Sequence, residues 1–261
     1  MTGTESRILL KANSVTMLFG GLRAVDSVDM EIYAGEIRGL IGPNGAGKTT
    51  LFNVISGIYR ATGGSVEFDG ADITRLRPHQ VAELGMSRTF QNLQLFDTMS
   101  AIDNVMIGRH RLMRAGVVST MFKTPKMKRE EKVCREKAME VLGFVGLRPY
   151  AQSAARALPY GKKRILEVAR ALASEPKILM LDEPCAGMNP TEQQELIELV
   201  NKIRESGITV LLVEHNMRVA MGLCGIITVL DHGIKICEDV PSVVQNDARV
   251  IEAYLGKSRG A

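Results

Sequence analysis

A glycine-rich loop between a short apolar strand and a helix constrains the fold of this chain most strongly. Residues 37–41 are typical of a buried strand, and the sequence LFNVISGIY, which starts at Leu51, repeats apolar residues at helical spacing. Between them, GPNGAGKTT matches the pattern G-x-x-x-x-G-K-[ST]. Such a loop turns its backbone N–H groups inward around phosphate groups, with the positive end of the following helix behind them. The order strand, loop and helix therefore predicts a P-loop.

Each residue type in this loop suits a nucleotide phosphate. Lys48 places a positive charge on the β- and γ-phosphates, and the hydroxyl of Thr49 is positioned to ligate Mg²⁺. A glycine-rich turn without a ligand is the competing interpretation, and the flanking strand and helix make it the weaker one. The predicted phosphate-binding residues are Gly42, Pro43, Asn44, Gly45, Ala46, Gly47, Lys48, Thr49 and Thr50.

Two later apolar strands end in polar residues. Residues 178–181 lead into Asp182 and Glu183, and the run ITVLLVEH ends at His215. The carboxyl ends of such strands form the ligand-binding edge of an open α/β sheet. We expect Asp182 to hold hydrated Mg²⁺ and Glu183 to polarise the attacking water. A solvated acidic turn remains the alternative for the two carboxylates. His215 and Gln91, which follows MSRTF, are each compatible with a purely structural role.

The order of elements indicates an α/β fold. The first third of the chain is rich in strands, and strands later alternate with helices, which implies a mostly parallel sheet. Residues from about 92 to 159 carry helical patterns without a convincing buried strand, and we interpret them as a helical insertion. A last strand near residues 226–230 and a short helical tail complete the prediction. The chain has one P-loop and no internal repeat.

The positive charge is concentrated in one segment. The whole chain of 261 residues has a formal charge of +4, yet residues 109–137 contain ten Lys or Arg against three Glu, a local charge of +7. This distribution argues against a nucleic-acid-binding protein, which would be basic over a whole face. For the segment itself, a solvated helix face and contact with an anionic membrane or acidic partner both remain open.

Composition predicts a soluble protein in a reducing compartment. Apolar residues make up 45% of the chain, enough for a large core, but no apolar stretch approaches the roughly 20 residues of a membrane-spanning helix. The first residues lack the pattern of a secretory signal. The four cysteines show no CxxC spacing, so we expect packed thiols rather than zinc ligands or disulfides.

The ordered set of motifs resembles the ATP-binding subunit of ABC transporters over essentially the whole chain. It comprises GPNGAGKTT, Gln91, the run LPYGKKRILEVARALASEPKILMLDEP, AGMNP, and the EH pair that ends at His215. The resemblance implies an ATPase with a RecA-like P-loop NTPase core, an N-terminal antiparallel β subdomain and a helical subdomain with the signature sequence. It places the core at residues 1–91 and 164–245, the helical subdomain at 92–163 and a tail at 246–261.

The same resemblance assigns roles that the residues alone do not. It implies that ATP and Mg²⁺ are bound, that two chains enclose two ATP molecules, and that the signature residues Tyr160, Gly161 and Lys162 reach the γ-phosphate held by the other copy. Gln91 would contact Mg²⁺ and relay the nucleotide state to the helical insertion, and His215 would hold the γ-phosphate and the water. The sequence AGMN at residues 186–189 would contact the other copy. Phe19 would stack on adenine, unless it is an ordinary core residue.

The chain departs from the family pattern at two places. The usual signature is LSGGQ, whose serine donates a hydroxyl group. Pro159 stands at that position and donates nothing, so the contacts would depend on Gly161 and the N–H groups of the helix that Gly161 opens, where Lys162 and Lys163 also lie. Gly225 and Ile226 stand where Asp-Arg is frequent, and nothing in the sequence explains that change.

Further details resemble the ATPase subunits of branched-chain amino-acid importers. They are FGGLRAVDSV, RTFQNLQLF, the LPYG form of the signature, EHNM and the ending VIEAYLG. This resemblance implies permease subunits in the membrane, a second ATPase subunit or a second copy of this chain, and indirectly a solute-binding protein. The chain would lie at the cytoplasmic face of the inner membrane. The alternatives are a soluble ABC-type ATPase in assembly or DNA-associated work, whose relatives carry long coiled coils or two P-loops, and the ATPase of a lipid exporter, which more often has LSGG.

Overall fold

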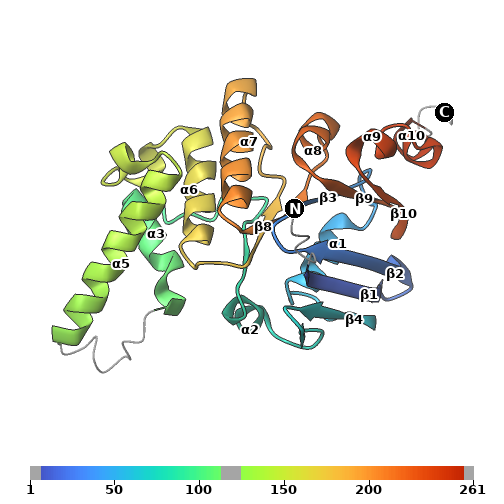
Figure 1. The fold of residues 1–261 in the computed structure, drawn as a ribbon, viewed down its shortest axis with the longest axis horizontal. Coiled ribbons are helices and arrows are strands. Elements are labelled where there is room, and N and C mark those ends of the chain that lie inside the picture. The colour runs from blue at the N-terminus through green and yellow to red at the C-terminus, as the bar shows by residue number, and fades with distance from the viewer. Residues whose placement is uncertain (1–6, 113–124, 256–261) are drawn as a thin grey trace, which may run out of the picture.

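The computed structural model describes residues 7–112 and 125–255, which contain two β-sheets (Figure 1). The smaller sheet is antiparallel and has the strand order β2-β1-β4-β5. Its first two strands are long and joined at a glycine turn, as the sequence indicates. The strands are β1 (Ile8–Phe19), β2 (Leu22–Tyr33), β4 (Gly63–Phe68) and β5 (Ala71–Asp72).

The larger sheet has six strands in the order β10-β9-β3-β8-β7-β6 and is parallel except for β10. The prediction of a mostly parallel α/β sheet is confirmed. The strand β10 was not predicted, although it pairs with β9 through a two-residue turn at His232 and Gly233, both with positive φ. The strands are β3 (Ile37–Ile41), β6 (Met86–Arg88), β7 (Ile178–Asp182), β8 (Thr209–Val213), β9 (Ile226–Asp231) and β10 (Ile234–Asp239).

Both faces of the larger sheet are covered, which explains its continuous apolar strands. In β7, Ile178 and Met180 pack with α1 (Lys48–Ile55) and the smaller sheet, whereas Leu179 and Leu181 pack with helices on the other face. Every residue of β3, β7 and β8 is buried. The sheet therefore provides a rigid platform from which loops emerge at the carboxyl ends of its strands.

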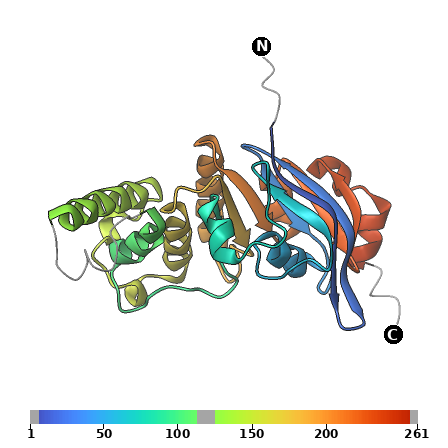
Figure 2. The same ribbon diagram turned by 90° about the horizontal axis from the view of Figure 1, so that it is seen from below.

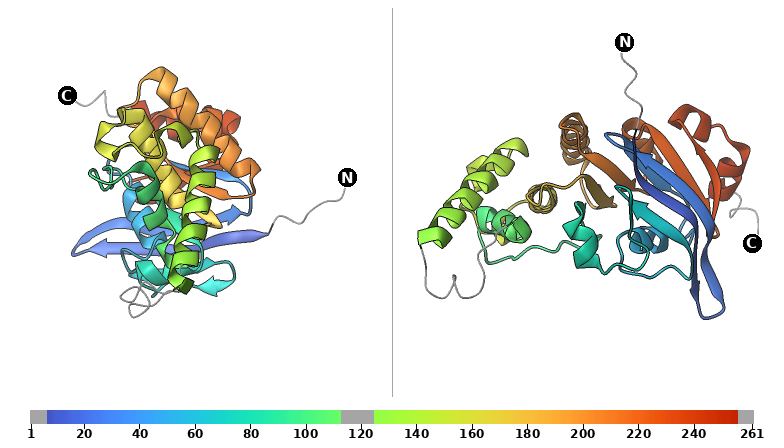
Figure 3. Two further views of the ribbon diagram at one scale, coloured as in Figure 1. Left: turned by 90° about the vertical axis from the view of Figure 1, so that its left-hand side faces the viewer. Right: turned by 60° about the horizontal axis from the view of Figure 1, so that its bottom comes forward.

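Four of the helices extend the molecule away from the smaller sheet. Helices α3 and α5 lie at one end, the smaller sheet lies at the other, and α6 and α7 lie between them (Figures 1 and 2). The same separation is visible in the right-hand view of Figure 3. In the part of the chain that the structure describes, no helix combines the length and apolarity needed to cross a bilayer. The helices after α1 are α2 (Pro78–Glu83), α3 (Ala101–Gly108), α5 (Pro125–Phe144), α6 (Tyr160–Leu172), α7 (Pro190–Glu205), α8 (Met217–Leu223), α9 (Pro241–Val244) and α10 (Ala248–Leu255).

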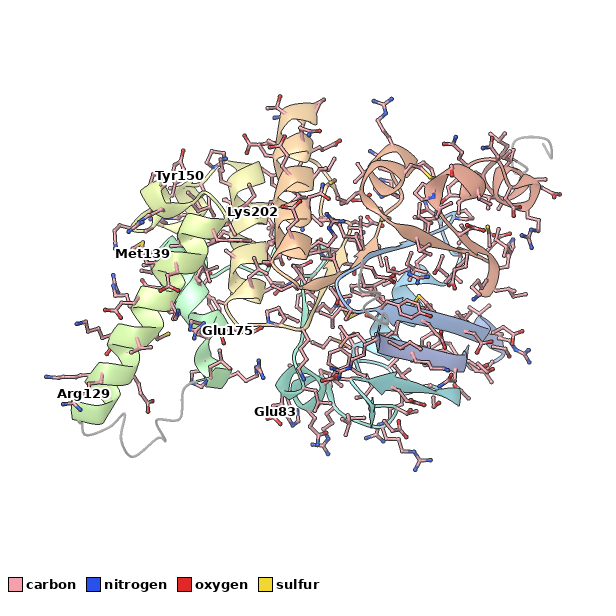
Figure 4. The ribbon with its side chains drawn as sticks, in the orientation of Figure 1. Glu83, Arg129, Met139, Tyr150, Glu175 and Lys202 are labelled. Carbon is pink, nitrogen blue, oxygen red and sulfur yellow. The ribbon has the colours of Figure 1, made fainter. Side chains whose placement is uncertain are left out.

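The basic segment divides between exposed and buried positions. Arg129 lies at the outer end of α5, far from the larger sheet (Figure 4), and Lys132 and Arg135 are also exposed. Arg109 is instead buried and donates to Glu175 at 2.8 Å. Residues 113–124 of the segment lie outside the described residues. Among the described residues, the exposed charges of this segment therefore lie on α5 and at Arg111, while Arg109 joins α3 to the loop after α6.

All four cysteines are buried and unbridged, as predicted. Burial raises the pKa of each thiol, to about 12 for Cys185 and Cys224. They behave as small apolar residues of the core.

Candidate functional site

Predicted site residues from three loops converge at the carboxyl ends of strands of the larger sheet. The glycine-rich loop follows β3, Glu183 follows β7 and His215 lies just beyond β8. An open pocket of about 570 Å³ lies at this edge. Its lining residues are Phe19, Leu22, Arg23, Ala24, Asn44, Gly45, Ala46, Gly47, Lys48, Thr49, Thr50, Gln91, Glu183, His232 and Gly233.

The loop depends on glycine at two points where the backbone of another segment approaches closely. A Cβ atom at Gly42 would lie 2.1 Å from the carbonyl oxygen of Leu230, and one at Gly47 would lie 2.4 Å from that of Ala24. Both residues also have positive φ, at 150° and 98°. The loop is thus fixed against β2 and the β9–β10 hairpin.

Lys48 is held inside the loop. Its Nζ donates to the carbonyl oxygens of Gly42 at 2.7 Å and Pro43 at 2.9 Å. The side chain is 7% exposed, and burial lowers its pKa, while the carboxylates of Glu183 and Asp182 act in the opposite direction. The Lys48 ammonium group is therefore held by two backbone carbonyl oxygens, and phosphate oxygens could replace them or bind beside them.

Asp182 lies beneath the pocket rather than in its lining. Burial raises the pKa of its carboxyl group, and Arg88, 3.4 Å away, opposes that effect. Arg88 is itself fixed by Asn53 and Ser56, each at 2.7 Å. Arg88, which α1 residues hold in place, therefore fixes the Asp182 carboxylate at the end of β7.

Glu183 is the point where three predicted residues meet. Its Oε2 accepts a hydrogen bond from Nε2 of Gln91 at 3.2 Å and lies 3.5 Å from Nδ1 of His215. Glu183 has a φ of 46°, a region that residues other than glycine seldom adopt, and its N–H donates to Val213. The backbone is thus locally strained where the carboxylate enters the pocket.

Phe19 lies at the mouth of the pocket, at the end of β1. The residue is 43% exposed, and its ring contacts that of Tyr59 edge to face, with the ring centroids 5.4 Å apart. This exposure excludes the alternative of an ordinary core phenylalanine. An exposed aromatic ring in the pocket lining suits a planar base, although the stacking role stays a prediction.

The three signature residues do not line the pocket and instead contact the segment 186–195. Tyr160 donates to the carbonyl oxygen of Ala186 at 3.0 Å, and Lys162 pairs with Glu195 at 2.8 Å. The N–H of Gly161 donates to Oε1 of Glu192 at 3.2 Å. The start of α6 is therefore free of its own P-loop, as expected, but its first N–H groups have an acidic neighbour from α7.

Several residues of the site were missed by sequence reasoning. Arg164, buried on α6, donates to the carbonyl oxygens of Phe90 and Gln91 and so fixes the segment of Gln91. His232 enters the pocket lining from the β9–β10 turn. The pair His232 and Gly233 before the alternating run IKICED could have indicated this hairpin, whereas nothing local marks Arg164.

The chain matches two family models. The model described as ABC transporter matches residues 25–186, and the model described as branched-chain amino acid ATP-binding cassette transporter matches residues 235–259. The first range contains the phosphate loop, Asp182 and Glu183.

Curated proteins resemble the chain over nearly its full length. The high-affinity branched-chain amino acid transport ATP-binding protein BraF of Pseudomonas aeruginosa is 41% identical over 254 residues, which cover 97% of this chain and 100% of that protein. LivG of Escherichia coli K12, which has the same description, shows the same identity and coverage. A probable LivG of Archaeoglobus fulgidus is 36% identical over 95% of each chain.

Solved structures share the fold. The ADP conformation of MJ1267, an ATP-binding cassette of an ABC transporter, superimposes with a TM-score of 0.85 and 31% identity over 96% of this chain and 100% of that one. A dimeric post-hydrolysis state of the cassette MJ0796, bound to ADP and phosphate, has a TM-score of 0.74 and 25% identity over 89% and 99%.

Proposed function

The chain belongs to the ABC transporter family, and we propose that this ATPase powers the import of branched-chain or related amino acids through separate membrane subunits. The observation that carries this proposal is the convergence of Gln91 and His215 on the Glu183 carboxylate at the mouth of the phosphate pocket. The match of residues 235–259 and the relatives with 41% identity support the class of substrate.

The phosphate loop would hold ATP. Lys48 would exchange its two carbonyl acceptors for phosphate oxygens, and the N–H groups at the start of α1 would face the same phosphates. Phe19 would stack on the adenine. The volume of about 570 Å³ lies in the range of small-molecule sites, which supports this assignment.

The donor atoms near the loop fit Mg²⁺. A hydroxyl oxygen of Thr49, an amide oxygen of Gln91 and a carboxylate of Asp182 are hard ligands, which Mg²⁺ prefers. The described residues contain no cluster of three or more His, Cys, Asp or Glu side chains placed to hold a metal, as is usual where water and phosphate supply most ligands. Bound Mg²⁺ would neutralise charge on the phosphates.

Hydrolysis would depend on Glu183 and His215. The Glu183 carboxylate would accept a proton from the attacking water, and its contact with Gln91 would hold it toward the pocket. His215, whose side chain is 55% exposed, would reach the γ-phosphate and the water from the adjacent loop. Both residues would act by their position beside the water and the γ-phosphate, and no covalent bond would form between the protein and the phosphate.

A partner copy or a second ATPase subunit would complete the site. Tyr160, Gly161 and Lys162 lie outside the pocket of their own chain, so an ATP that they contact would be held by the other copy, and they would exchange their present partners for it. The dimeric post-hydrolysis state of MJ0796 supports this arrangement.

The permease would bind next to the segment of Gln91, through which the presence of ATP or ADP would be relayed to the helices. A cavity of about 210 Å³ lies beside the segment of Gln91, with Arg88 and Glu167 among its lining residues and Ile107 exposed at its edge. We propose that this surface, at the cytoplasmic face of the inner membrane, receives the permease.

Residues 1–91 and 164–245 would form the core, 92–163 the helical subdomain and 246–261 a tail. A solute-binding protein would act only through the permease.

The variant Glu183→Gln tests the catalytic assignment. We expect hydrolysis to fall by about 10²- to 10⁴-fold because the amide cannot accept the proton of the attacking water, whereas ATP remains bound and the chain accumulates as a dimer. Phosphate release and size-exclusion chromatography with ATP measure both effects. The exposed Glu198→Gln variant is the control. An unchanged hydrolysis rate in Glu183→Gln would remove the role of Glu183.

Copurification and transport test the proposed partners and substrate. The natively expressed chain should purify with membrane permeases, and the reconstituted complex should accumulate leucine in an ATP-dependent way with its solute-binding protein present. The Glu183→Gln complex serves as the matched control without hydrolysis. Copurification only with cytosolic proteins would contradict the transport role, and uptake of a different solute class would contradict the substrate alone.

A further inference from the structure

Glu214 is a buried carboxylate that the proposed mechanism does not use. It follows β8 directly and is 1% exposed. Within the described residues, no Lys or Arg forms an ion pair with it, and burial raises its pKa. A buried acid without a cation is costly to fold, so its surroundings must provide other donors.

Those donors are two backbone N–H groups on different loops. Oε1 of Glu214 accepts from the N–H of Cys185 at 3.3 Å, and Oε2 accepts from the N–H of Asn216 at 3.3 Å. The thiol of Cys185 also lies close to this carboxylate. Burial, together with the negative charge of Glu214, raises the pKa of the Cys185 thiol to about 12. One carboxylate therefore joins two loops that are separate in sequence.

Each of these loops carries a residue of the proposed catalytic pair. Cys185 is two residues after Glu183, and Asn216 is adjacent to His215 and caps the start of α8 with its side chain. A further link runs from the N–H of Glu183 to Val213, next to Glu214. The 3.5 Å contact between Glu183 and His215 thus lies beside this bridge.

We propose that Glu214 is a positioning residue that fixes the loops of Glu183 and His215 relative to each other. The inference rests on the proposed roles of Glu183 and His215. Glu214 does not contact the phosphate pocket and acts only through the two loops.

The variant Glu214→Gln tests this role with little change in size. Its amide NH₂ must face one of the two N–H groups, so one of the two bonds is lost. We expect kcat for ATP hydrolysis to fall at least about tenfold, in keeping with the loss of one hydrogen bond to a charged group. The KM for ATP should change less than about twofold, since Lys48 and the phosphate loop are untouched. Retention of full kcat would overturn the proposal.

A double-mutant comparison separates positioning from a general structural effect. If Glu214 acts through His215, Glu214→Gln should lower kcat by less than about twofold in a His215→Ala background, because groups that act as a unit are not additive. Losses that multiply in full would overturn the proposal. Glu214→Asp keeps the charge but shortens the reach and should show the same loss as Glu214→Gln.

Amide hydrogen exchange gives a readout that does not depend on hydrolysis. In Glu214→Gln, at least one of the two N–H groups, that of Cys185 or that of Asn216, should lose protection against exchange by about tenfold. This is the effect expected from the loss of one hydrogen bond to a charged group. The exposed Glu205→Gln variant should leave both unchanged. Unchanged protection in Glu214→Gln would overturn the bridge. If the unaltered chain hydrolysed no ATP, the proposed function would fail, while exchange would still decide whether Glu214 joins the loops.

Discussion

Two glycines of the phosphate loop leave no room for a Cβ atom, whereas a third, Gly45, does leave room. Gly42→Ala places a Cβ atom against the Leu230 carbonyl oxygen at 2.1 Å, whereas Cβ at Gly45 meets nothing within 4 Å. Both residues have positive φ, so both variants carry backbone strain. We expect Gly42→Ala to lower the free energy of unfolding by about 2 to 4 kcal/mol and Gly45→Ala by about 1 kcal/mol.

Urea denaturation of the two glycine variants checks this difference. Equal midpoints would show that the loop moves freely away from the β9–β10 hairpin. Nucleotide binding, measured by calorimetry on the folded fraction, should also weaken more in Gly42→Ala, because its backbone must shift where the phosphates enter.

The buried Glu167 makes stability depend on pH. Burial raises the pKa of its carboxyl group above the ordinary value of 4.5, and Arg164 only partly opposes this. The stability that this group contributes is present below pH 4.5 and is lost as pH rises through the raised pKa. The wild-type chain should therefore lose stability relative to Glu167→Gln as pH rises above 4.5 and through that raised pKa. Paired denaturation curves measure this, and a constant difference would contradict it.

Sequence reasoning found those site residues that follow a strand or belong to a glycine motif. Asp182, Glu183 and His215 could be predicted to share an edge because parallel strands end together. Arg164 and Glu214 could not, since their partners lie 73 and 29 positions away and no local pattern encodes such pairs. From sequence alone, an acidic residue after an apolar strand is expected to be exposed, because the N–H groups that stabilise it when buried are known only from the structure.

At the scale of elements, the start of α7 supports the start of α6. Glu192 accepts from the N–H of Asn189 at 3.0 Å in a capping box and also from the N–H of Gly161. One side chain thus satisfies backbone donors of two helices.

Removal of the Glu192 side chain should therefore cost more than an ordinary surface change. We expect Glu192→Ala to lower the free energy of unfolding by about 1 to 2 kcal/mol, against less than about 0.5 kcal/mol for Glu198→Ala on the same helix. Thermal and urea denaturation measure the two variants. A loss in Glu192→Ala no larger than in the control would show that neither helix depends on this carboxylate.

The elements that were predicted well have a strong period or a clear boundary. Helix α7, which Asn189 and Ser206 cap, has apolar residues at helical spacing and a glycine just after its end. The strand β10 was missed because only Cys237 within it is fully buried, so its apolar signal is weak. The turn at His232 and Gly233 was the remaining local signal for its pairing with β9.

For the whole molecule, the C-terminal helix brings Tyr254 close to the start of the phosphate loop. Burial raises the pKa of Tyr254 to about 12, while the backbone N–H of Gly42, close to the phenol oxygen, opposes this effect. Val250 of the same helix is 2% exposed and belongs to the large core. Helix α10 and Gly42, the first residue of the loop, are therefore close in space although most of the sequence separates them.

Deletion of residues 248–261 should weaken ATP binding as well as stability. We expect the Kd for ATP to rise at least about threefold, or about 0.7 kcal/mol, because Gly42 loses its packing partner. Calorimetry on the truncated and full chains measures it, with Tyr254→Phe as the variant that keeps the ring. An unchanged Kd in the folded truncated chain would show that the helix supports the core only.

The buried cysteines also decide how this protein can be labelled. Thiols with raised pKa, enclosed in the core, form little thiolate at neutral pH and react slowly with maleimides. A single cysteine introduced at an exposed position such as Arg129 would then be the fast-reacting site against an intact native background. Dyes or spin labels that follow the approach of two copies could thus be attached without first replacing any of the four native residues.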